Sequence, residues 1–190
     1  MGVQVINMTS KIKVNILADG GDNSIITSDG AGSFTASSGL ASSVQSVGGI
    51  QNTPAFIATN NTATSMSGDT WTVYTFDAEV VDTDSAFDTS TYKFTVPTGK
   101  AGTYLFTVDV SWSTAPDGCL MSVAIAKNGS RFVIQQEDLG STQSLNMSVT
   151  GIINCSVGDE IQAYLRHEHS GNTENTGTGQ RFSGFRLIGA

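Results

Sequence analysis

Hydrophobic and polar side chains alternate from Thr103 to Trp112. The apolar positions on one face are Tyr104, Phe106, Val108, Val110 and Trp112, and the other face is polar except for Leu105. A period of two is typical of a half-buried antiparallel strand. We therefore predict a strand here, and it serves as the reference for the rest of the chain.

Shorter alternating runs follow towards the C-terminus. They are Met121–Ile125, Leu145–Val149, Ile161–Leu165 and Arg181–Ile188. The dipeptide Asn128-Gly129 predicts a hairpin, because both residues accept the positive φ of a type I′ turn. No stretch has the period of an amphipathic helix. Many short strands separated by turns predict an all-β sandwich or jelly roll.

Residues 1–57 differ in composition from the rest. Ser24–Thr27 and Ser33–Thr35 resemble short strands, whereas Ser37–Asn52 is rich in Ser, Gly, Ala and Val and lacks aromatic and charged residues. Such a segment cannot bury enough apolar surface to fold alone. We therefore expect two regions: an extended, β-rich N-terminal arm over 1–57 and a head over 58–190. The arm would be ordered by sister chains or a larger assembly, or by packing on its own head.

Aromatic residues before and within the central strand have a distinctive spacing. Phe76, Asp82, Phe87 and Phe94 begin the pattern, and Gly102, Tyr104 and Phe106 continue it after a short insertion. The stretches Gly158–Ile161 and Phe182–Phe185 add two motifs near the C-terminus. In this order the motifs resemble those of the globular head of complement component C1q and the wider C1q/tumour-necrosis-factor jelly-roll family. Val108 departs from the pattern, which has an aromatic residue there.

The resemblance implies a fold and an assembly, but no activity, since function depends on sites that vary on one fold. It implies a jelly-roll sandwich of about ten antiparallel strands that forms a homotrimer. The residues that carry this signature are Phe76, Phe87, Phe94, Gly102, Tyr104, Phe106, Phe182, Gly184 and Phe185.

Charge excludes two classes of partner. The 190-residue chain has 9 Lys and Arg against 17 Asp and Glu, a net charge of −8. Nucleic acid and anionic lipid both require clustered basic side chains, so we expect neither as a partner. No apolar run is long enough for a membrane-spanning helix, and the N-terminus lacks the apolar core of a secretory signal. We therefore expect no membrane insertion.

Two polar loops are candidates for ligand binding. The turn Thr114–Gly118 contains Asp117 and Gly118, and the loop Ser170–Gln180 contains Asn172, Glu174 and Asn175. Long loops carried by a rigid sheet are frequent binding sites. A glycan or protein on a cell surface is the expected ligand.

Two groups of side chains could hold a metal, although we expect no obligatory cofactor. His167 and His169 would share one face of a strand, so that both imidazoles could reach one ion. Asp82, Asp84 and Asp88 crowd one loop and offer oxygen ligands suited to calcium. The alternative is that both groups are solvated polar residues.

Neither histidine lies in the sequence context of a catalytic nucleophile, and neither a Gly-x-Ser-x-Gly elbow nor a phosphate-binding loop occurs. A carboxylate pair for glycoside cleavage is the remaining enzymatic alternative, and we expect no enzyme activity. Cys119 and Cys155 either pair or remain as free, buried residues.

The N-terminal stretch Ser10–Asn15 resembles the start of small fibre and decoration proteins of phage virions. We therefore expect a non-enzymatic virion protein, located on the tail or capsid surface. Residues 1–57 would bind other virion proteins, and the head would recognise the host surface. The alternative is a soluble C1q-like module that binds carbohydrate or protein outside a virion.

Overall fold

The computed structural model describes residues 16–18, 24–28, 34–36 and 52–189. The chain divides into two units, Met1–Gln51 and Asn52–Ala190. Among the described residues, every regular element is a strand, and no helix is long and apolar enough to cross a membrane. The prediction of an all-β chain is therefore confirmed.

The described part of the N-terminal unit is a small antiparallel sheet. It contains β1 (Ile16–Ala18), β2 (Ser24–Ser28) and β3 (Phe34–Ala36), paired in that order. Strands were predicted at the last two of these positions. The predicted linker Ser37–Asn52 lies outside the described residues except for its last residue.

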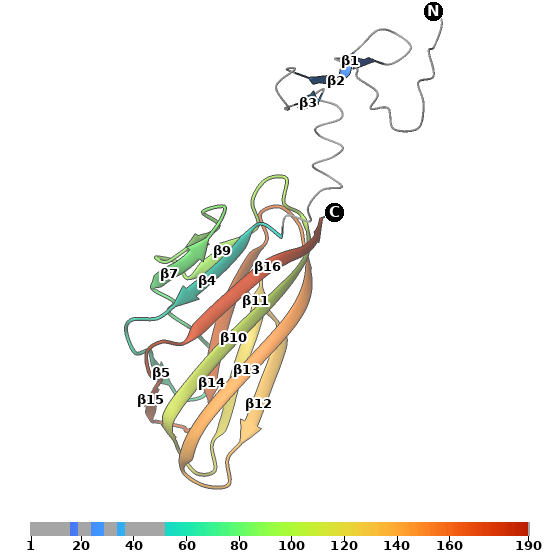
Figure 1. Ribbon diagram of the computed structural model, residues 1–190. Helices are drawn as coiled ribbons and strands as arrows, with labels where there is room; N and C mark the ends of the chain where they lie inside the picture. The colour runs from blue at the N-terminus through green and yellow to red at the C-terminus, as the bar shows by residue number, and fades with distance from the viewer. Residues whose placement is uncertain (1–15, 19–23, 29–33, 37–51, 190) are drawn as a thin grey trace, which may run out of the picture. The chain divides into compact units, whose positions relative to one another are not determined.

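The head is a sandwich of two antiparallel sheets, visible as two layers in Figure 1. The five-stranded sheet has the order β13 (Gln143–Cys155), β10 (Gly102–Ala115), β16 (Arg181–Gly189), β4 (Ala55–Thr59) and β7 (Ala78–Asp82). The six-stranded sheet has the order β12 (Ser130–Asp138), β11 (Leu120–Lys127), β14 (Glu160–His167), β9 (Lys93–Thr95) and β8 (Phe87–Asp88), with β6 (Thr72–Val73) also paired to β14. Apart from the consecutive pairs β11–β12 and β8–β9, strands adjacent in each sheet are not consecutive in the sequence, as in a jelly roll.

The predicted boundary between residues 57 and 58 needs correction, because it falls inside β4. This strand pairs with β16 on one side and β7 on the other, with Phe56 opposite Gly184 and Asp82. Phe56 is buried in the core of the head. Residues 55–57 therefore belong to the head.

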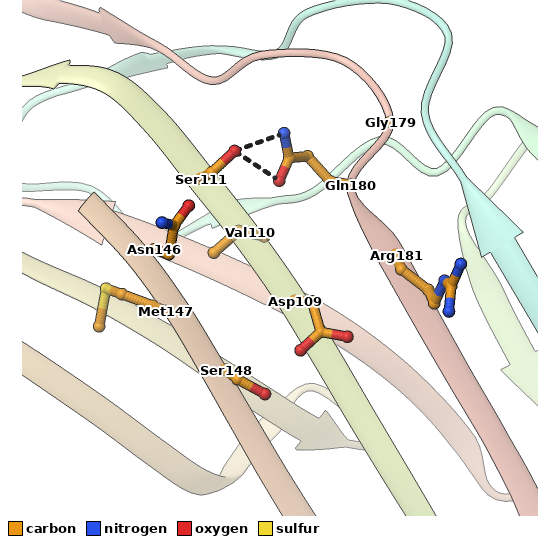
Figure 2. Close-up of a pocket in the computed structure, with 9 residues that line it drawn as sticks. All are labelled: Asp109, Val110, Ser111, Asn146, Met147, Ser148, Gly179, Gln180 and Arg181. Carbon is orange, nitrogen blue, oxygen red and sulfur yellow. Dashed lines mark hydrogen bonds between the residues drawn. The ribbon is translucent and has the colours of Figure 1, made fainter. Parts of the chain in front are cut away.

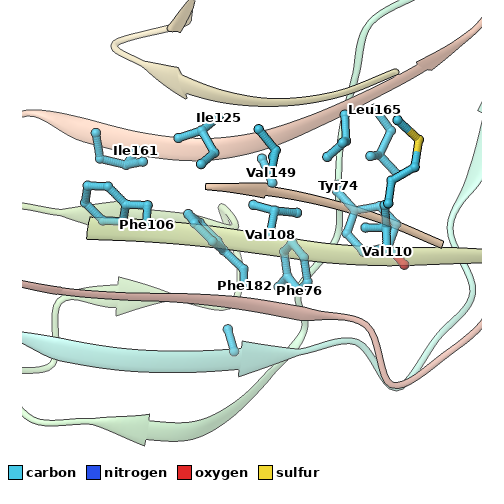
Figure 3. Packing of buried hydrophobic residues seen from close by; sticks show 14 of the residues in the cluster. Tyr74, Phe76, Phe106, Val108, Val110, Ile125, Val149, Ile161, Leu165 and Phe182 are labelled. Carbon is cyan, nitrogen blue, oxygen red and sulfur yellow. The ribbon is translucent and has the colours of Figure 1, made fainter. Parts of the chain in front are cut away.

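The central strand β10 confirms the alternation predicted for it. Its even-numbered residues from Tyr104 to Trp112 are buried, and Leu105 lies on the outer face between Thr103 and Thr107 of the same strand. The inward side chains meet those of β11 and β14 between the two sheets (Figure 3). Burial of this apolar surface is the main stabilising contribution of the head.

Most of the aromatic signature forms one cluster. Phe56 stacks on Phe94 with ring centroids 4.9 Å apart and meets Phe182 edge to face at the same distance. Phe106 lies 5.6 Å from both Phe94 and Tyr104. A β-carbon on Gly184 would overlap the ring of Phe106, so the glycine is required by this close approach. Phe76 and Phe87 join the cluster, whereas Phe185 points to the outer face.

One predicted turn and several short segments complete the head. Asn128 and Gly129, at φ 51° and 76°, form the predicted hairpin turn between β11 and β12. Tyr74 follows β6 and still donates its N–H to Ala163 O of β14 at 2.9 Å, and the side chains of Tyr74 and Phe76 are buried in the core. The polar loop after β14 also contains β15 (Thr173–Asn175), which pairs with β5 (Ser65–Ser67).

Candidate functional site

The outer face of the five-stranded sheet changes in character along its strands. One row across the sheet places Ile152, Leu105 and Phe185 side by side by register. Ile152 is 63% exposed, and Leu105 and Phe185 are half-buried. Antiparallel sheets normally present polar side chains to water. An apolar row on the solvent side therefore does not stabilise a monomer and is typical of an interaction surface.

The next row is made of hydroxyl groups. Thr150, Thr107 and Ser183 lie side by side, and the two threonine hydroxyls are 3.0 Å apart. The same row continues across the sheet from Ser183 to Ile57 on β4 and Val81 on β7, where the side chains are apolar. The apolar surface therefore extends diagonally across the sheet.

Beyond these rows the face becomes charged and hollow. A pocket of about 380 Å³ is lined by residues of β10, β13 and the segment leading into β16, among them Asp109, Ser148 and Arg181 (Figure 2). Asp109 and Arg181 are register partners but make no ion pair with each other. Gln180 donates to and accepts from the Ser111 hydroxyl at 3.0 and 3.2 Å. Sequence analysis did not identify this pocket, since its residues are far apart in the chain.

The predicted binding loops lie at one end of the head, opposite the C-terminus of β16 (Figure 1). Asp117 and Gly118 form the exposed turn between β10 and β11, and Gly118 N–H donates to Leu139 O at 2.7 Å. Asn172 and Asn175 are exposed, whereas Glu174 is half-buried. Glu168 N–H donates to Leu120 O at 3.0 Å and thereby joins the start of the long loop to β11.

The two histidines do not converge as the sequence suggested. His167 is fully buried: its Nε2 lies 3.0 Å from Met66 O, and its Nδ1 accepts from His169 N–H at 3.3 Å. In this pattern Nδ1 is an acceptor, and Nε2 is placed to donate to Met66 O. His169 lies beyond the end of β14, and its Nδ1 is 2.7 Å from Glu174 Oε1. The expected strand geometry ends at His167, so the rings have different partners.

The carboxylates of the acidic loop are each engaged separately. Asp82 accepts from the N–H groups of Asp84 and Phe87, and Asp84 pairs with Lys100 at 3.3 Å. Asp88 accepts hydrogen bonds from Ser90 and Thr91, which lower its pKa to about 2. Among the described residues, no group of three or more His, Cys, Asp and Glu is placed to hold a metal. The loop carboxylates stabilise turns.

The cysteines follow the alternative of two free, buried residues. Cys119 and Cys155 are both buried and unpaired. Burial raises the pKa of the Cys155 thiol to about 11 and also raises that of Cys119. A raised pKa keeps each thiol protonated and unreactive at neutral pH.

A buried polar network fixes the loops at this end, and sequence analysis missed it. Asn60 is 1% exposed, and its Nδ2 is 2.9 Å from the Tyr74 hydroxyl and 3.0 Å from Gly177 O. Its Oδ1 accepts from Gln180 N–H at 2.8 Å. The Tyr74 hydroxyl is also 2.8 Å from that of Thr176, and burial raises its pKa to about 12. The network therefore joins residues that lie far apart in sequence.

Comparisons with known proteins agree with this architecture. A model of the C1q domain matches residues 55–187, and no curated protein sequence matches the chain. The globular domain of zebrafish complement 1qA protein is similar, with a TM-score of 0.54, 16% identity, and coverage of 72% of this chain and 99% of that one. Eiger TNF from S. frugiperda has a TM-score of 0.51 and 13% identity, with coverage of 72% of this chain and 93% of that one. Murine APRIL has a TM-score of 0.53 and 14% identity, with coverage of 70% of this chain and 98% of that one.

Proposed function

The chain belongs to the C1q domain family, and from this premise we propose that it is a non-enzymatic recognition module that works as a homotrimer. The family match confirms the resemblance inferred from the aromatic spacing. The observation that carries the proposal is the outward-facing apolar row of Ile152, Leu105 and Phe185 on the five-stranded sheet, in which Ile152 is 63% exposed. In a cyclic trimer, each of the three subunits would bury its apolar row against a neighbouring subunit and remove it from water.

The rows beside the apolar row suit an interface as well. Interfaces combine an apolar centre with a polar rim that is satisfied across the contact. Thr107 and Thr150 provide hydroxyls next to the apolar row, and Asp109 and Arg181 provide unpaired charges of both signs farther out. In the trimer, these charges would meet groups of a neighbouring subunit.

Recognition would take place at the loop-bearing end of the head. Asp117, Gly118 and the exposed residues of Ser170–Gln180 are carried by long strands and by the Asn60 network. Three such ends on one trimer would raise a weak single-site affinity through multivalency. A host-surface glycan or protein remains the proposed ligand.

The mass of the full-length chain in solution tests the assembly. We expect light scattering to give a species of about three chain masses, each 19.8 kDa, over the micromolar range. The same measurement with chelator tests the calcium and transition-metal alternatives, because a metal-dependent trimer would dissociate. A stable monomer at these concentrations would contradict the proposal.

The finer placement on a phage tail or capsid rests on the N-terminal resemblance. We propose that residues 1–51 attach the head to other virion proteins, so that a chain without them stays trimeric but no longer joins particles. If the shortened chain joins particles as well as the full chain, the arm is not the attachment segment. If no particle contains the chain, the soluble module outside a virion is the better description.

A further inference from the structure

A second pocket lies beside the sandwich and belongs to none of the loops predicted to bind. It has a volume of about 380 Å³ and is bordered by the β4–β5 connection, by β6 and the segment after it, and by the β8–β9 turn. Its lining includes Thr62, Ser65, Thr72, Asp77 and Tyr92. The volume is within the range typical of small-molecule sites.

The lining offers polar groups that the chain leaves unused. Within the described residues, the side-chain hydroxyls of Thr62, Ser65, Thr72 and Tyr92 make no hydrogen bond. Asp77 Oδ1 accepts from Asn61 N–H at 2.6 Å, and its Oδ2 receives no hydrogen bond from the described residues. Hydroxyl groups both donate and accept, whereas an ionised carboxylate only accepts. The pocket therefore offers several acceptors and donors beside one negative charge.

Tyr92 is held in a costly backbone conformation. Its φ is 58°, in the left-handed region that a bulky residue seldom adopts. The turn is fixed by Tyr92 N–H donating to Asp88 O at 2.7 Å and by the hydrogen bonds of the Asp88 carboxylate. Glycine would suit this position better. A strained aromatic residue at the wall of a pocket is the kind of outlier from which a binding role is inferred.

The floor of the pocket is rigid because it continues into the buried polar network. The hydroxyls of Thr64 and Thr75, which also line the pocket, are hydrogen-bonded to each other. Thr64 N–H donates to the Thr176 hydroxyl at 3.3 Å, and that hydroxyl contacts Tyr74. A preorganised floor lowers the entropic cost of binding a ligand.

From this arrangement we propose that the pocket binds a neutral sugar residue. A sugar ring has an apolar C–H face that packs on an aromatic ring and hydroxyls that both donate and accept. Here Tyr92 would provide the ring, Asp77 Oδ2 would accept from a sugar hydroxyl, and the Thr and Ser hydroxyls would complete the contacts. Among the described residues that line the pocket there is no Lys or Arg, so an anionic sugar or phosphate would be repelled by Asp77.

The sugar site rests on the recognition role proposed above and gives it a specific class of ligand. All of its residues come from one chain, so sugar binding does not require the trimer. Loss of sugar binding with an intact trimer would overturn only the pocket, and a monomer that still binds sugar would overturn only the trimer. The two proposals therefore fail separately.

The test uses the full-length chain and methyl glycosides of glucose, galactose, mannose and N-acetylglucosamine, each observed by saturation-transfer and ¹⁵N-shift NMR. We expect at least one glycoside to bind and to shift the amides of residues 62–65 and 75–77, and N-acetylneuraminic acid to shift none. Binding by none of the four glycosides would overturn the proposal.

Two variants assign the binding to the pocket. Tyr92→Gly removes the ring in a backbone conformation that glycine favours, so the melting temperature should stay equal or rise while affinity falls about tenfold. Ser85→Gly is the matched control, because Ser85 has φ 51° but does not line the pocket. Asp77→Asn should weaken binding by about tenfold as well. Wild-type affinity in Tyr92→Gly, or an equal loss in Ser85→Gly, would overturn the assignment.

Discussion

The two halves of the interior of the head are held by different forces. In one half, Phe56, Phe94 and Phe106 pack with ring centroids 4.9–6.3 Å apart. In the other half, the Asn60 side chain holds the loop backbone at Gly177 O and Gln180 N–H and also binds the Tyr74 hydroxyl. Aromatic burial is large and tolerates small shifts, whereas a hydrogen-bond network fixes positions but adds less net free energy. The aromatic half therefore stabilises the fold, and the polar half positions the loops.

The largest effect should come from the aromatic half. Phe106→Ala removes a fully buried ring that contacts Phe56, Phe94 and Tyr104. We expect the free energy of unfolding to fall by about 3–5 kcal/mol, measured by urea denaturation. Phe132→Ala is the control, because Phe132 is 59% exposed and should change stability by less than about 0.5 kcal/mol. Equal losses in the two variants would contradict the account of the core.

A smaller and more local effect is expected in the polar half. Asn60→Ala leaves the Tyr74 hydroxyl, Gly177 O and Gln180 N–H without their Asn60 partner, which should cost about 1–3 kcal/mol. Amide exchange should accelerate mainly in residues 60–66 and 173–180. The neighbour Asn61 is exposed, so Asn61→Ala should change neither quantity. If amide exchange accelerated equally in β10 and β11, the network would stabilise the whole head, and the difference between the two halves would be contradicted.

The smallest effect is expected from acid. Hydrogen bonds from Ser90 and Thr91 lower the pKa of Asp88 to about 2. Although burial acts to raise it, hydrogen bonds from Lys127, Asn128 and Ser156 N–H lower the pKa of Asp159 to about 2 as well. Both values lie below the ordinary 3.8. The stabilisation of the fold by these two ionised carboxylates is therefore present in full above about pH 4 and is lost as the pH falls towards 2.

Thermal melting between pH 5 and pH 2 measures this loss. Asp159→Asn should lower the melting temperature at pH 5 and reduce the further decrease on acidification. Asp117→Asn, at an exposed turn, should follow the wild-type curve. A melting temperature of the wild type that stays constant down to pH 2 would refute a stabilising role for these carboxylates.

The fold could be predicted because its determinants are local patterns. The alternation in β10 and the Asn128-Gly129 turn each specify one element, and the spacing of Phe76, Phe87 and Phe94 indicated the family. The first strand of the head was cut by the predicted boundary, since a composition change does not mark where sheet pairing begins.

The sites could not be predicted in the same way. The Asn60 network joins residues that are up to 120 positions apart in sequence. The Tyr92 pocket combines several separate segments between Thr62 and Tyr92, so no local spacing marks either feature. The His167 and His169 pair illustrates the converse error. The strand rule of two-residue spacing applies only while the strand continues, and β14 ends at His167.

The most direct test of the account compares two exposed hydrophobic side chains on different sheets. Ile152 is 63% exposed on β13 of the five-stranded sheet, and Phe132 is 59% exposed on β12 of the six-stranded sheet. Sedimentation equilibrium of Ile152→Asp and Phe132→Asp measures the state of each full-length variant. The account predicts that Phe132→Asp remains trimeric, while Ile152→Asp dissociates to folded monomers. A trimeric Ile152→Asp, or equal dissociation of Phe132→Asp, would contradict the assignment of the apolar row as the trimer surface.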